Sequence, residues 1–84
     1  MTQFTTLDVW DRVTLHASVE AVVTFIRQTS ADPRRTKYFM DREATVPLSV
    51  EALTEAFAEQ TRDSVLIYVQ NVPYRPSYKV TRHE

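Results

Sequence analysis

The chain contains no glycine in its 84 residues. Loops that hold a phosphate against the backbone need glycine, because a Cβ atom would block the close approach of the ligand. Walker loops, dinucleotide-binding fingerprints and nucleophile elbows all depend on such glycines. Their standard forms are therefore excluded, and the tight turns of this chain must use Asn, Asp, Ser and Pro.

The length predicts one domain over residues 1–84, and we expect about 1–5 and 82–84 to be flexible. The absence of cysteine excludes disulfides, thiolate metal sites and cysteine nucleophiles. Small domains outside the cell usually need disulfides. The N-terminus lacks the basic start and apolar run of a signal peptide, and the apolar stretch 65–69 is too short to span a bilayer. We therefore expect a cytoplasmic protein that does not associate with membranes.

Two segments have the spacing of amphipathic helices, and a serine precedes each of them. Apolar residues recur every three or four positions after Ser18 and again after Ser49. A serine at this position accepts a hydrogen bond from the first helical turn. The spacing predicts helices over 19–29 and 50–61. Both begin with the letters Ser-Val-Glu-Ala, which indicates either an internal repeat or only the general rules of helix capping.

The remaining patterned segments predict strands at 7–17, 36–40, 44–48, 64–70 and 74–81. The first of these is interrupted near Trp10 and Asp11, which predicts either one bent strand or two short strands. Its alternation assigns Val13 and Leu15 to the side that faces the core. The run at 64–70 is almost entirely apolar, which predicts a strand covered on both faces. Pro47 is expected at a strand end or a sheet edge, because it has no N–H to donate.

Two strand–helix–strand units followed by one more strand predict an α+β fold. The order is that of a ferredoxin-like βαββαβ sandwich with an additional C-terminal strand. Both helices should lie on one face of an antiparallel sheet, and the other face should be exposed or meet a partner. A fold of this kind implies no particular activity.

No pattern in the chain predicts catalysis, a metal site or a cofactor. The two histidines, His16 and His83, have neither the spacing of metal ligands nor an arrangement with a nucleophile, and we expect both at the surface. We therefore predict a protein that is not an enzyme and that uses no cofactor or metal. The enzyme alternative would require a deep pocket that holds a polar group with a perturbed pKa.

An acidic stripe and three aromatic residues predict a surface for another protein. The stripe places one glutamate on each turn along one side of the second helix, at Glu51, Glu55 and Glu59. It indicates either a solvated helix face or a contact for a basic partner. Trp10 is expected to face outward as an interface anchor or to cover a sheet edge, and Tyr74 and Tyr78 add aromatic surface on the last strand.

These features predict a small regulator or inhibitor that acts by contact with another protein or with a second copy of itself, as a homodimer. Small proteins of this kind are common in phages and mobile elements, which is one origin consistent with this hypothesis.

The alternative is a module that binds single-stranded nucleic acid. Its candidate residues interleave cations with aromatic rings, which neutralise phosphates and stack on bases, and they are Arg34, Arg35, Lys37, Tyr38, Phe39 and Arg42. These residues can also be explained without a ligand, since the aromatic rings could pack in the core or a hairpin and the cations could serve ordinary solubility. With a net charge of −1, any attraction for nucleic acid must be local.

Overall fold

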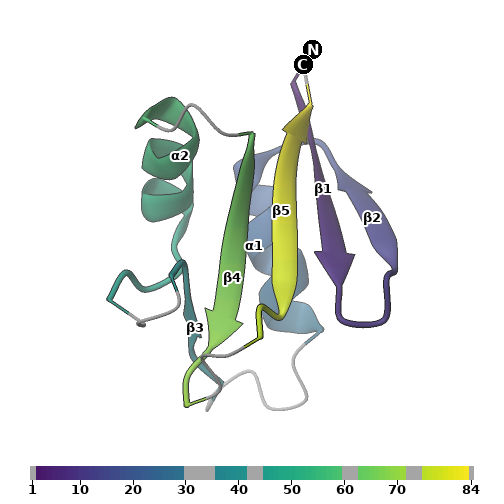
Figure 1. Cartoon of the computed structure of the whole chain (residues 1–84). Coiled ribbons are helices and arrows are strands. Elements are labelled where there is room, and N and C mark those ends of the chain that lie inside the picture. Colours follow the sequence, from purple (N-terminus) through teal and green to yellow (C-terminus); the bar gives the residue numbers. More distant parts are fainter. Residues whose placement is uncertain (1, 30–35, 42–44, 60–62, 72–74, 84) are drawn as a thin grey trace.

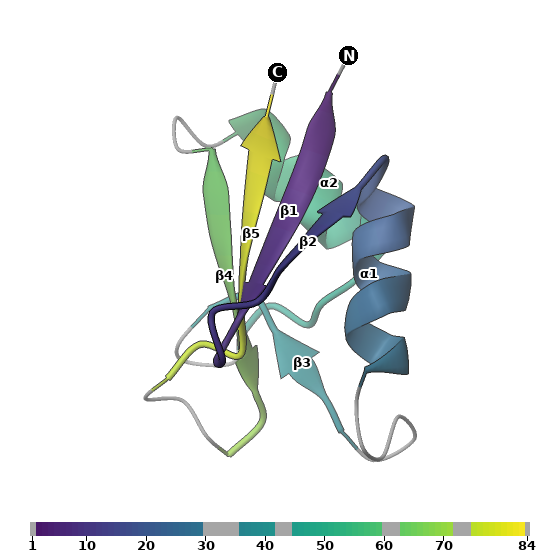
Figure 2. The same ribbon diagram turned by 90° about the vertical axis from the view of Figure 1, so that its right-hand side faces the viewer.

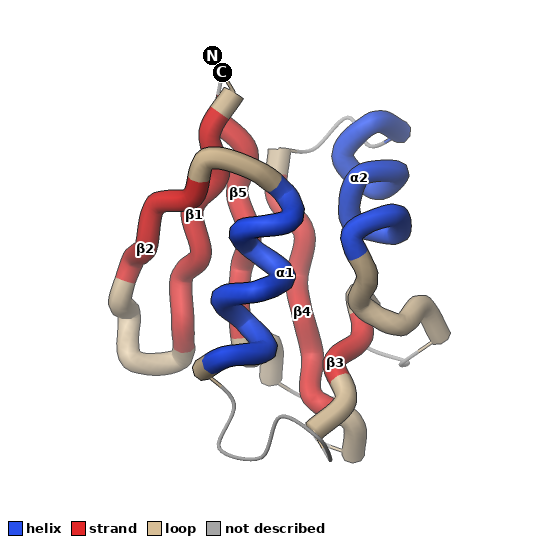
Figure 3. Tube along the Cα trace, turned by 180° about the vertical axis from the view of Figure 1, so that it is seen from behind, coloured by secondary structure: helices blue, strands red, loops and turns tan. Residues whose placement is uncertain are grey.

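A computed structural model of the chain describes residues 2–29, 36–41, 45–59, 63–71 and 75–83. The five strands form one antiparallel sheet in the order β2-β1-β5-β4-β3, and both helices lie on the same face of it (Figure 1, Figure 3). This confirms the predicted α+β class, and the order of strands and helices fits a ferredoxin-like arrangement plus an extra strand. The elements are β1 (Gln3–Asp8), β2 (Val13–His16), α1 (Val19–Gln28), β3 (Tyr38–Phe39), α2 (Val50–Glu59), β4 (Ser64–Val69) and β5 (Tyr78–His83).

The centre of the sheet is formed by β5, which lies between β1 and β4 (Figure 1). Gln3 pairs with His83, and Asp8 pairs with Tyr78 at the other end of the same strands. Residues 3–5 and 82–83, which we expected to be flexible, therefore belong to paired strands. Arg82 also joins β5 to the end of α2, because its Nη1 donates to the carbonyl of Phe57 at 2.9 Å.

Serine caps begin both helices, as the sequence predicts. The hydroxyl of Ser18 accepts a hydrogen bond from the N–H of Ala21 at 3.1 Å, and that of Ser49 accepts one from Ala52 at 3.0 Å. These bonds satisfy N–H groups that have no partner inside the helix. Each cap fixes the residue at which its helix begins.

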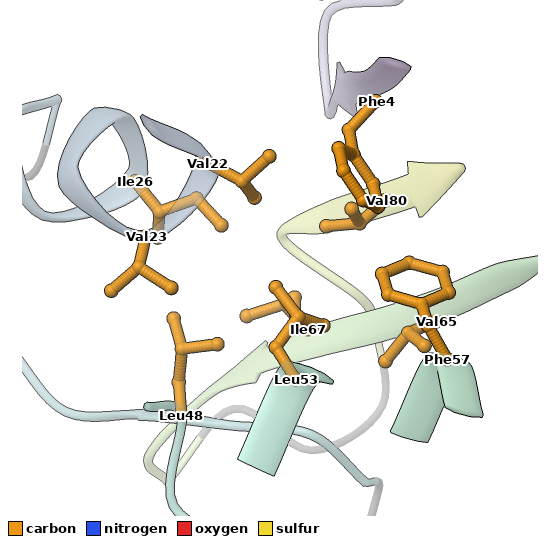
Figure 4. Packing of buried hydrophobic residues seen from close by; sticks show 10 residues of the cluster. All are labelled: Phe4, Val22, Val23, Ile26, Leu48, Leu53, Phe57, Val65, Ile67 and Val80. Carbon is orange, nitrogen blue, oxygen red and sulfur yellow. The ribbon is translucent and has the colours of Figure 1, made fainter. Parts of the chain in front are cut away.

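The core lies between the helices and the sheet (Figure 4). Side chains of Ile26, Leu53 and Ile67 are fully buried there, and burial of a side chain of this size contributes about 1.5–3 kcal/mol. The rings of Phe4 and Phe57 pack with their centroids 5.3 Å apart. The cluster consists of Phe4, Val22, Val23, Ile26, Leu48, Leu53, Phe57, Val65, Ile67 and Val80.

The segment predicted as a strand over 7–17 is a hairpin, so the alternative of two short strands is confirmed. The turn between β1 and β2 is held by Asp8, whose Oδ1 accepts hydrogen bonds from the N–H groups of Trp10 and Arg12, both at 2.9 Å. Asp11 adopts a positive φ of 60°, and Asn71 adopts 67°. Asn and Asp tolerate this conformation better than other residues with a Cβ, so they take the place that glycine has in other chains.

The two short strands predicted at 36–40 and 44–48 are smaller than expected. Only Tyr38 and Phe39 form β3, and the second segment contributes an isolated bridge between Phe39 and Pro47. The N–H of Leu48 donates to the carbonyl of Tyr38 at 2.9 Å beside this bridge. Pro47 thus lies at an edge of the sheet, as predicted.

Candidate functional site

The hairpin of β1 and β2 presents most of its aliphatic residues to the uncovered face of the sheet, whereas Phe4 of β1 faces the core. Val13 and Leu15 are 65% and 61% exposed, whereas we expected both to face the core. Thr14 and His16, which alternate with them, lie on the side of the helices, and His16 is buried. The prediction failed because a period of two shows which residues share a face but not which face becomes covered.

Two polar groups lie beside Phe4 on the covered side of this hairpin. Thr6 and His16 are buried, and the Oγ1 of Thr6 lies 3.0 Å from the Nε2 of His16. The ring of His16 also packs against Phe25 of α1, with centroids 4.8 Å apart. The surface position that we predicted for His16 is therefore wrong. Burial lowers the pKa of His16 below its ordinary value of 6.5, since it disfavours the charged form.

A row of side chains crosses the uncovered face from β2 to β4. Val13 stands opposite Leu7, Leu7 opposite Lys79, and Lys79 opposite Leu66. Leu66 is 40% exposed, so β4 is not covered on both faces along its whole length, contrary to our prediction. We name the four apolar residues of this side the apolar sheet face, which consists of Leu7, Val13, Leu15 and Leu66.

A shallow cavity of about 280 Å³ adjoins this row. Leu7, Leu66 and Pro76 belong to its apolar wall. Arg75 and Lys79 supply two cations, and Asp8 and Asp11 supply two carboxylates. The Nη2 of Arg75 donates to the carbonyl of Val9 at 3.4 Å, which holds the guanidinium beside the hairpin turn. The uncovered face therefore combines aliphatic surface with charges of both signs.

Trp10 lies in the hairpin turn with 73% of its surface exposed, in agreement with the expected outward position. The guanidinium of Arg12 lies 5.2 Å from the centroid of its ring. Trp10 and Arg12 also line a cavity of about 270 Å³ with Phe25, Thr29 and Tyr78, where α1 ends. The indole is thus an exposed aromatic surface at the tip of the hairpin.

The other residues proposed for protein binding lie elsewhere. Glu51 and Glu55 are exposed on α2, and Glu59 belongs to the same helix, although its side chain is outside the described part of the chain. Tyr74 is also outside the described residues. Tyr78 is half-buried, and its hydroxyl oxygen lies 2.7 Å from the Oγ1 of Thr29. Seen from behind, α2 and β2 lie on opposite sides of α1 (Figure 3), so the acidic stripe and Trp10 do not form one surface.

Part of the basic-aromatic segment lines a cavity with a volume of about 610 Å³. Lys37, Tyr38 and Phe39 belong to it, whereas Arg34, Arg35 and Arg42 lie outside the described residues. Arg27 from the last turn of α1 also lines it, although sequence analysis did not select this residue. We name this cavity the edge groove; its described lining is Arg27, Thr36, Lys37, Tyr38, Phe39, Pro47 and Leu48.

The described residues include no group of three or more His, Cys, Asp or Glu side chains that could hold a metal ion. Within the same part of the chain, no helix is both long and apolar enough to cross a membrane. No protein family, curated protein or solved structure matches the chain.

Proposed function

We propose that this chain is a non-enzymatic binding protein whose apolar sheet face contacts another protein. One observation carries the proposal: the uncovered side of the β1–β2 hairpin holds Leu7, Val13 and Leu15, while Thr6 and His16 lie with Phe4 on the covered side. A sheet with one solvated face ordinarily has polar residues on that face. A partner that covers the apolar sheet face removes its aliphatic surface from water, which favours association.

The surroundings of this face indicate the chemistry of the partner. Lys79 stands within the row of aliphatic side chains, and Arg75 lies beside it. Asp8 and Asp11 line the same cavity as these two cations. A complementary surface therefore has aliphatic side chains at its centre and charged groups of both signs at its rim. The exposed ring of Trp10, flanked by Arg12, lies at the tip of the hairpin toward the end of α1 and not on this face. It adds residue types that often anchor protein interfaces.

The role that fits these features is that of a small regulator or inhibitor, which acts by occupying a surface of its partner. The partner is either a different protein or a second copy of this chain. The proposal places the protein in the cytoplasm, where a small domain without disulfides is the ordinary case.

Site-specific photocrosslinking in the native cell tests this function. A photoreactive amino acid at position 66, on the apolar sheet face, should give one defined protein adduct, which mass spectrometry assigns to another protein or to a second copy. A probe at Thr24, which is exposed on α1, is the control and should not give that adduct. Leu15→Glu should abolish the adduct of the first probe, whereas Thr24→Glu should leave it intact. No adduct at position 66, or the same adducts from both probes, would contradict the proposal.

A further inference from the structure

We propose that the edge groove is a second site, independent of the apolar sheet face, and that it binds a segment of single-stranded nucleic acid. The groove combines cations with aromatic rings at one edge of the sheet, next to β3. Its volume of about 610 Å³ lies within the range of about 300–1,000 Å³ that is typical of ligand sites.

Two cations reach the groove from different elements. Arg27 lies in the last turn of α1, and Lys37 directly precedes β3; both side chains are exposed. No carboxylate belongs to the described lining of the groove. The Nη2 of Arg27 donates to the carbonyl of Leu48 at the long distance of 3.5 Å. A guanidinium has five N–H donors, so this bond orients the group and leaves donors that can hold a phosphate.

Two aromatic side chains of β3 also line the groove, one on each side of this strand. Tyr38 packs against the core, with its ring centroid 6.2 Å from that of Tyr78. Phe39 is the next residue of the same strand and points to the opposite side; both rings keep part of their surface exposed. The exposed part of an aromatic ring is a platform on which a base stacks with little preference for sequence.

Nucleic acid explains the groove better than an acidic peptide does. An acidic peptide would use the two cations but has no need of the aromatic rings, whereas a nucleotide uses both. The whole chain has a net charge of −1, so attraction for a polyanion depends on this local arrangement.

Fluorescence anisotropy with a labelled single-stranded oligonucleotide of mixed sequence at low salt tests the proposal. Arg27→Gln and Lys37→Gln should each weaken binding, and each should reduce the slope of log Kd against log salt by about 0.7, because each variant neutralises one phosphate fewer. Phe39→Leu should weaken binding about tenfold without changing the salt slope, because it removes a stacking ring but no charge. Lys79→Gln is the matched control, since this exposed cation is not among the residues that line the edge groove, and it should change neither quantity.

Competition separates the possible ligands. Unlabelled oligonucleotide should displace the probe at much lower concentration than adenosine monophosphate, and inorganic phosphate should be weaker than both. Equal displacement by inorganic phosphate or by a polyglutamate peptide would overturn the proposal, as would the absence of any anisotropy change with the wild type. An equal effect of Lys79→Gln and Arg27→Gln would also overturn it. Circular dichroism of Phe39→Leu verifies that this variant is folded, and failure here leaves the function proposed for the sheet face intact.

Discussion

His16 and Thr6 face each other beneath α1, with the Nε2 of the imidazole 3.0 Å from the Oγ1 of the hydroxyl. Neither side chain is near water, because Thr6 is 1% and His16 7% exposed. A buried polar pair of this kind is tolerated because each group gives the other a hydrogen-bond partner. The pair therefore fixes β2 against β1 while the imidazole stays neutral.

The neutral imidazole makes stability depend on pH. Burial lowers the pKa of His16 in the folded state below 6.5, so at falling pH the unfolded chain binds a proton before the folded chain does. The free energy of unfolding should therefore decrease as the pH falls below about 6.5. Urea unfolding at about pH 7.5 and about pH 5.5 measures this loss.

His16→Gln should remove this contribution, so that its unfolding free energy changes less between the two pH values than that of the wild type. His83→Gln is the control, since His83 is exposed at the end of β5, and it should keep the full dependence. An unchanged pH dependence in His16→Gln would show that His16 is not the group responsible.

The two serine caps should contribute similar stability. Ser18→Ala and Ser49→Ala each remove one hydrogen bond to a helix N-terminus, and each should lower the unfolding free energy by about 1 kcal/mol. Aspartate also caps helices, so Ser18→Asp and Ser49→Asp should retain most of the stability. The test is chemical denaturation, and equal losses in the Ala and Asp variants would argue against the capping role.

The orientation of the hairpin can be tested by the stability of isolated variants. Leu15→Thr should change the unfolding free energy by no more than about 0.5 kcal/mol, since Leu15 is exposed on the uncovered face. Leu53→Ala should cost about 2–5 kcal/mol, because it leaves a cavity in the core. Both values follow from urea unfolding in dilute solution. A loss in Leu15→Thr as large as that in Leu53→Ala would place Leu15 in the interior.

The turn at Asn71 should accept glycine better than alanine. Its φ of 67° lies in the left-handed region, which costs a residue with a Cβ about 1–2 kcal/mol. Asn71→Ala should therefore lower the melting temperature, whereas Asn71→Gly should equal or exceed the wild type. Asp11→Gly at φ 60° provides an independent replicate of the same effect. If alanine and glycine gave the same melting temperature at position 71, the left-handed conformation would be disproved.

Local patterns in the sequence predict the fold class well. The spacing after Ser18 and Ser49 marks both helices, because a helix must place its apolar residues on one side and satisfy its first N–H groups. The orientation of the hairpin was not predictable in this way. Thr6 and His16 can be buried because their side chains form a hydrogen bond with each other across two strands. A prediction of the core from hydrophobicity alone leaves out such a polar pair.

The edge groove shows that a binding site, too, can be predicted only in part from local sequence. Lys37, Tyr38 and Phe39 are adjacent in the sequence and could be selected as a basic-aromatic segment. Arg27 joins them only because α1 ends near β3. Nothing in the local sequence distinguishes Arg27 from any other solvated residue of a helix. A lining residue that comes from a distant element can therefore be identified only from the tertiary structure.

The central position of β5 has a consequence for the order in which the protein folds. A nascent chain that has emerged as far as α2 contains the β1–β2 hairpin and both helices, yet β1 still lacks its partner on the inner side (Figure 2). Pairing of β1 with β5 closes a loop that spans almost the whole chain, and contacts of such long range make folding slow and cooperative. Assembly on the ribosome must therefore wait for residues 78–83, and until then the aliphatic side chains of both helices remain available to chaperones.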